Sequence, residues 1–185
     1  MADVLSLFSS HLPQLEYLRI CNVFGSLSMA ESELFYSGAK LTCLKELVVK
    51  YWAGSEHSWL PLANFIRAAP YLQRFVVEAW HHLPIICDER KFEKIEGSYP
   101  HLKEVKFVGY SGATRQQELI MQILHGATSL EKIIVDPRGI IIGSTLILHK
   151  KICMKRIIDG QTDARARAKQ QLPEIVPPRN HLEIL

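Results

Sequence analysis

The chain has 185 residues, of which 48% are hydrophobic, and its formal net charge is +3. This length fits one domain or one repeat array, and the small net charge gives no whole-chain case for binding nucleic acid or an anionic membrane. The charge is uneven, because the segment 149–171 has a net charge of +5 from seven basic residues and two acids, which leaves −2 for the rest.

Cysteine spacing and the N-terminus indicate the cellular compartment. The four cysteines form no C-x-x-C pair, and they are Cys21, Cys43, Cys87 and Cys153. Disulfide scaffolds and zinc modules have other spacings, so we expect reduced thiols in a cytoplasmic or nuclear protein. The first residues lack the basic and apolar regions of a signal peptide, and the most apolar stretch, 139–148, is about half as long as a membrane-spanning helix. We therefore expect no membrane partner.

A leucine-centred segment with the pattern apolar-x-x-apolar-x-apolar recurs five times. The copies begin at Leu15, Leu44, Leu72, Leu102 and Leu130, so the spacings are 29, 28, 30 and 28 residues. This period is typical of leucine-rich repeats, whose strands stack in parallel as a solenoid and present a surface to a partner. The sequence therefore predicts an α/β solenoid of about five repeats, and a binding protein rather than an enzyme.

Each repeat opens with a turn, continues as a strand rich in Val, Ile and Phe, and returns through a variable connector. Residues 4–11 indicate a first helix. The connectors 59–69 and 114–125 have the apolar spacing of helices. Thr114 is the expected cap of the second of these, and Gly126 is its expected stop.

The leucine pattern becomes irregular after residue 135. The segment 139–160 has no clear assignment. Residues 163–172 predict a basic helix that is capped by Asp163 and stopped by Pro173. The apolar tail 181–185 repeats the strand pattern and indicates one last strand.

Side chains alternate across a strand, so every second residue of each copy faces the concave surface of the solenoid. Three of the five copies have an aromatic residue just beyond the strand, eight positions past the leading leucine. These aromatic residues either cover the edge of the core or form a rim that contacts a partner. The concave apolar residues are either a patch that faces a ligand or strand-forming residues with no partner. The candidate partner-binding residues are Arg19, Val48, Lys50, Val76, Glu78, Lys106 and Ile134, with Trp52, Trp80 and Tyr110 second.

No catalytic or nucleotide-binding motif is present, and no nucleophile, base and orienting group can be placed together. His81 and His82, with Cys87 and Asp88, lack the second cluster that would complete four metal ligands. We therefore expect no enzyme activity, no metal site and no cofactor. The basic segment 149–171 is either a solvated helix face or a contact to nucleic acid, and nucleic-acid binding is thus an alternative function.

Several stretches follow one another in a fixed order: PHLKEVKFVGYSG at 100–112, ELI at 118–120, ILHGA at 123–127, LEKIIVDP at 130–137, ARARAKQQL at 164–172 and HLEI at 181–184. This order resembles the FBD region of plant F-box proteins, and the earlier repeats resemble the leucine-rich repeats that precede that region. The resemblance covers nearly the whole chain. It implies a protein-interaction module like the substrate-recognition part of an SCF-type ubiquitin ligase subunit, with an FBD-type C-terminal cap on the solenoid.

The resemblance also implies partners and boundaries. The expected partner is an unidentified protein, with a Skp-type adaptor only where an F-box is present elsewhere, because no F-box pattern precedes the repeats. We divide the chain into leucine-rich repeats with a truncated N-terminal end, 1–98, and an FBD-like region with the last repeats, the basic helix and the terminal strand, 99–185. A truncated fragment without function is a further alternative.

Overall fold

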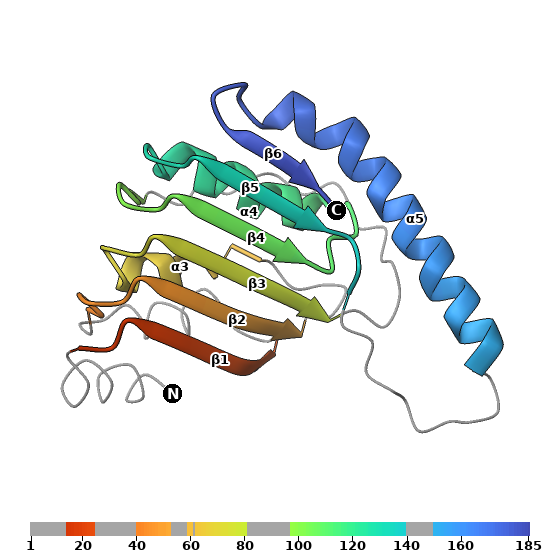
Figure 1. Ribbon diagram of the computed structural model, residues 1–185, viewed down its shortest axis with the longest axis horizontal. Helices are drawn as coiled ribbons and strands as arrows, with labels where there is room; N and C mark the ends of the chain where they lie inside the picture. Colours follow the sequence, from red (N-terminus) through yellow and green to blue (C-terminus); the bar gives the residue numbers. More distant parts are fainter. Residues whose placement is uncertain (1–13, 25–39, 53–58, 61, 81–96, 140–149) are drawn as a thin grey trace.

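The computed structural model describes residues 14–24, 40–52, 59–60, 62–80, 97–139 and 150–185, and it gives the backbone alone for 22–24, 52, 80 and 150–157. Six parallel strands form one sheet in the order of the chain (Figure 1). They are β1 (Tyr17–Phe24), β2 (Glu46–Trp52), β3 (Arg74–Trp80), β4 (Glu104–Val108), β5 (Lys132–Asp136) and β6 (His181–Ile184). The five predicted strands and the expected last strand are confirmed.

Within the described residues, three helices accompany the sheet: α3 (Leu62–Ala68), α4 (Thr114–Gly126) and α5 (Lys150–Ile175). Helices α3 and α4 lie on one face of the sheet, and α5 runs past the carboxyl ends of the strands (Figure 1). None of the described helices lies on the opposite face, which we call the open face. The two connector helices are confirmed, whereas the helix expected at 4–11 lies outside the described residues.

The core lies between the sheet and the two connector helices. Leu47, Phe75, Val105 and Ile133 occupy one register position on successive strands, and each is at most 1% exposed. Leu182 pairs with Ile133 and extends this row to β6. Full burial of one such side chain contributes about 1.5–3 kcal/mol, so the repeated leucine pattern encodes the stacking of the strands directly.

The start of α4 differs from the expectation. Ala113, not Thr114, is the cap residue, and its side chain makes no capping bond. Gln116 in the first turn instead accepts a hydrogen bond from the backbone N–H of Ser111 at 2.8 Å, because its long amide reaches back to the preceding turn. Gly126 is the last residue of the helix, as expected. The position requires glycine because of a close approach, since a Cβ there would lie 2.6 Å from the carbonyl oxygen of Gly97.

Helix α5 is much longer than the predicted 163–172, so both predicted ends are wrong. Asp163 lies in its middle, and Pro173 lies inside it. Pro173 lacks one backbone donor, but Val176 still donates to the carbonyl of Leu172 at 2.8 Å. Leu172 is 0% exposed and Val176 is 7% exposed, so apolar packing holds the last turn in place beyond the proline.

Candidate interaction surface on the open face of the sheet

Strand register arranges the open-face side chains in three rows. The amino row contains Tyr17, Glu46, Arg74, Glu104, Lys132 and His181; the central row contains Arg19, Val48, Val76, Lys106, Ile134 and Glu183; the carboxyl row contains Lys50, Glu78, Val108 and Asp136. The predicted alternation, in which every second residue of a strand faces the concave surface, is thus confirmed. The alternation also predicts Cys21 as a fifth member of the carboxyl row, but Cys21 does not join it, because the register of β1 shifts between Ile20 and Val23.

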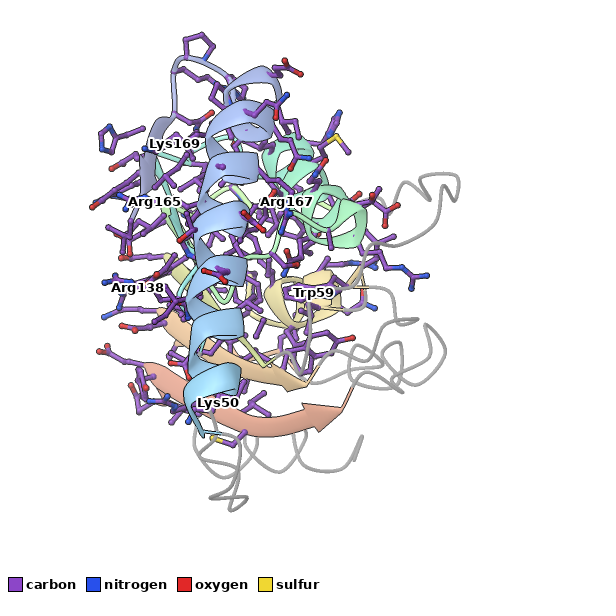
Figure 2. All side chains as sticks on the ribbon, turned by 90° about the vertical axis from the view of Figure 1, so that its right-hand side faces the viewer. Lys50, Trp59, Arg138, Arg165, Arg167 and Lys169 are labelled. Carbon is purple, nitrogen blue, oxygen red and sulfur yellow. The ribbon has the colours of Figure 1, made fainter. Side chains whose placement is uncertain are left out.

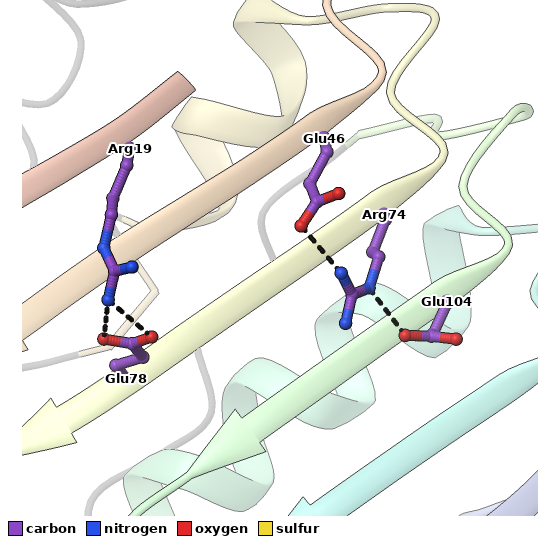
Figure 3. Close-up of polar contacts among 5 residues, drawn as sticks. All are labelled: Arg19, Glu46, Arg74, Glu78 and Glu104. Carbon is purple, nitrogen blue, oxygen red and sulfur yellow. Dashed lines mark hydrogen bonds and ion pairs between the residues drawn. The ribbon is translucent and has the colours of Figure 1, made fainter. Parts of the chain in front are cut away.

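In the amino row, Arg74 connects three strands. Its Nη1 lies 2.7 Å from Glu46 Oε1 on β2, and its Nε lies 2.7 Å from Glu104 Oε1 on β4 (Figure 3). None of these three residues is among the candidates that the sequence indicates. The signal that could have found them is the alternation of acidic and basic residues two positions after the leading leucines, with Glu46, Arg74, Glu104 and Lys132 in turn.

Arg19 reaches across a strand. Its Nη2 lies 2.9 and 2.8 Å from the two carboxylate oxygens of Glu78 on β3, so its side chain passes over β2 (Figure 3). Lys50 Nζ lies 3.8 Å from the same carboxylate. Three of the predicted residues therefore form one ion-paired group on the open face.

The open face is charged rather than apolar. We expected Val76 to be a surface position, but Val48 and Val76 are each 5% exposed and Ile134 is 9% exposed. Neighbouring strands stand about 4.8 Å apart, so each of these side chains packs between row neighbours on both sides. The long side chain of Arg19 crosses β2 to reach Glu78 on β3. The apolar residues of the central row thus form the floor beneath a charged surface.

The aromatic rim is only partly described. Tyr110 lies in the turn after β4 and is 1% exposed, and burial raises the pKa of its hydroxyl to about 12. Tyr110 therefore covers the edge of the core rather than forming an exposed rim. Trp52 and Trp80 pair in register, but their side chains lie outside the described residues.

Two further carboxylates of the open face are paired. Glu183 lies 2.6 Å from Lys132 Nζ, and this lysine lowers the pKa of the glutamate. Asp136 lies 2.8 Å from Arg138 Nε. Burial opposes ionisation of Asp136, but its bonds with Arg138 outweigh that effect, so the pKa of its carboxyl lies below the ordinary value.

The basic side chains that the structure describes on α5 do not form one stripe. Arg165 and Lys169 are exposed, whereas Arg167 points to the other side of the helix (Figure 2). Arg167 Nε donates to the carbonyl of Ser111 at 2.9 Å and so joins α5 to the turn before α4. The side chains of 150–157 lie outside the described residues.

The described residues include no group of three or more His, Cys, Asp and Glu side chains that could hold a metal ion. The candidates His81, His82, Cys87 and Asp88 lie outside the described residues. In the part of the chain that the structure describes, no helix has the length and apolar character to cross a membrane.

Parallel strands in chain order, a leucine-centred repeat and helices on one face together define a leucine-rich-repeat protein. A family model for the leucine-rich-repeat domain of At1g61320/AtMIF1 matches residues 3–185. The chain therefore belongs to this plant family of leucine-rich-repeat proteins. No curated protein and no solved structure matches the chain.

Proposed function

We propose that the chain binds another protein through the open face of its sheet. Leucine-rich-repeat domains generally bind proteins, which supports an interaction role. We choose the open face because none of the described helices covers it, so the three rows of side chains on its strands are accessible to a partner. A protein with charges complementary to these rows could dock there with little rearrangement.

The finer proposal is a role in ubiquitin transfer. The resemblance of 100–137 and 164–184 to the FBD region of plant F-box proteins supports a part like the substrate-recognition half of an SCF-type ligase. In that role the open face holds the protein to be modified. A Skp-type adaptor is a partner only where an F-box accompanies this chain.

Lysine footprinting tests the proposed surface. The chain is used to capture partners from plant lysate, and free and complexed chain are labelled with an amine-reactive reagent. Lys50, Lys106 and Lys132 lie on the open face, and we expect their labelling to fall in the complex. Lys45 and Lys103, whose side chains are 54% and 56% exposed just before β2 and β4, are matched controls that should stay reactive. Protection of the controls with unchanged open-face lysines contradicts the proposal.

The same captured material tests the finer proposal. Co-capture of the Skp-type adaptor and a cullin by the chain supports the ligase role. Their absence from material that contains an open-face partner contradicts it, while leaving the binding role intact.

A further inference from the structure

The charges of the open face do not balance. Its lysines and arginines, with Arg138 included, are Arg19, Lys50, Arg74, Lys106, Lys132 and Arg138; its acids are Glu46, Glu78, Glu104, Asp136 and Glu183. Each of the five carboxylates lies within 4.0 Å of a cation. Among these described side chains, Lys106 is the one cation without an ion pair. The excess positive charge of the open face therefore lies on Lys106.

Lys106 stands in the central row, on the fourth of the six strands. It is partly exposed, and its row neighbours Val76 and Ile134 are buried apolar side chains. Its charge acts on Asp136 and Glu183, which Arg138 and Lys132 already hold. The amino group of Lys106 is therefore available to an incoming acid.

The surroundings of Lys106 favour a carboxylate as its partner. When another protein covers this part of the sheet, water leaves and an ion pair above an apolar floor gains strength. A phosphate group is a poorer match, because it is best held by several arginines and would meet the negative charges of Asp136 and Glu183. A single lysine beside two ion-paired acids suits a single negative charge better than a doubly charged phosphate.

We propose that Lys106 is the anchor of the open face and binds an aspartate or glutamate side chain of an acidic segment in the partner protein. This inference rests on the proposed function, since it identifies the chemistry that the open face recognises. The ion pairs around Lys106 hold the neighbouring carboxylates in place, so that they do not compete for its charge.

Peptide selection tests the proposal without knowledge of the natural partner. A displayed library of random linear peptides is selected on the wild-type chain, and the recovered sequences should be enriched in Asp and Glu. A peptide from that selection is then titrated against three proteins: wild type, Lys106→Met and Lys103→Met. The methionine keeps the aliphatic stem and removes the charge in both variants. Loss of the Lys106 charge should weaken binding about tenfold or more, the range of a charge-assisted hydrogen bond, and loss of the Lys103 charge should not.

Charge reversal gives a second measurement. Selection on Lys106→Glu should recover peptides rich in Lys and Arg in place of acidic ones. A phosphorylated version of a selected peptide that binds more tightly than its acidic parent, and loses that gain in Lys106→Met, would replace a carboxylate by a phosphate as the ligand and overturn the proposal.

The outcomes separate this inference from the proposed function. Peptides that protect Lys50 and Lys132 from labelling, yet show no acidic enrichment and bind Lys106→Met as well as wild type, overturn the role of Lys106 and leave the open face as the binding surface. Peptides that leave all the open-face lysines reactive contradict both.

Discussion

Arg19 on β1 binds both carboxylate oxygens of Glu78 on β3, at 2.8 and 2.9 Å, across the whole width of β2. The two residues are 59 positions apart in the chain. Their pairing links three repeats and covers part of the central row. The same ion pair therefore holds the first three strands together and sets the charge of the open face at this position.

Glu78→Gln should lower the melting temperature by roughly 2–4 °C, because it removes the carboxylate that pairs with both Arg19 and Lys50. The side chain of Glu78 is only 15% exposed, so solvent screens these pairs less than at the surface. The control Glu16→Gln breaks an ion pair with Lys45 whose side chains are 62% and 54% exposed, and it should have a smaller effect. Calorimetry at low and high salt measures both. Equal melting temperatures for Glu78→Gln and wild type at low salt would show that the pairing across β2 adds no stability.

Val76→Asp should destabilise the fold strongly, because Val76 is 5% exposed and the new carboxylate would lose its water without a matching donor. A loss of at least about 2–4 kcal/mol is expected, the range for a buried unpaired polar group or charge. Lys106→Asp is the matched control, since Lys106 is the register partner of Val76 and is partly exposed. Its cost should stay within about 1 kcal/mol. Urea titration measures both, and equal losses would contradict the burial of Val76.

The strands could be predicted from the sequence because each copy carries its own leucine pattern. Leu47, Phe75 and Val105 repeat one local signal, and alternation along each strand then gives the open-face rows. The burial of Val48 and Val76 could not be predicted in this way. It depends on packing between row neighbours on adjacent strands, which come from other repeats, and no pattern within a single repeat contains those neighbours.

For helix α5, residues that are typical of helix ends led to wrong predicted limits. Asp163 and Pro173 are common at helix ends, so they set the predicted limits. In the structure, Ala164, Ala168 and Leu172 are at most 3% exposed, and their packing keeps one continuous helix through both signals. Burial against residues from distant repeats outweighed the local preferences, and the sequence alone did not reveal those neighbours.

Acid should destabilise the chain through Asp136 and Glu183. Their pKa values in the folded chain lie below the ordinary 3.8 and 4.5, so the unfolded chain binds protons first as the pH falls. The stability they add is complete above these ordinary values and is lost as the pH drops through the lower folded values. Asp136→Asn should be less stable than wild type at neutral pH.

Urea titrations across the acid range measure this difference between wild type and Asp136→Asn. The two proteins should converge once the pH lies below the folded pKa of Asp136, because the wild-type carboxyl is then neutral as well. A constant difference at every pH would mean that Asp136 stabilises the fold through its shape and hydrogen bonds rather than through its charge.

Two glycines in the turn between β4 and α4 should respond differently to the same substitution. Gly109 and Gly112 have φ angles of +79° and +82°, which cost an alanine about 1–2 kcal/mol each. At Gly109 the new Cβ would also lie 2.4 Å from the backbone carbonyl oxygen of Ala79 on β3, which cannot move without disturbing the sheet. At Gly112 it would meet the side chain of Arg167 at 2.9 Å, and a long side chain can shift.

Gly109→Ala should therefore cost more than Gly112→Ala, by about 1–3 kcal/mol, the usual price of overpacking. Gly112→Ala should instead loosen α5, because displacing Arg167 weakens its hydrogen bond to Ser111. Urea titration measures the costs, and hydrogen exchange of the amides in 164–175 measures the loosening. If Gly109→Ala loosened α5 as much as Gly112→Ala did, Arg167 would not be the link between this turn and the helix.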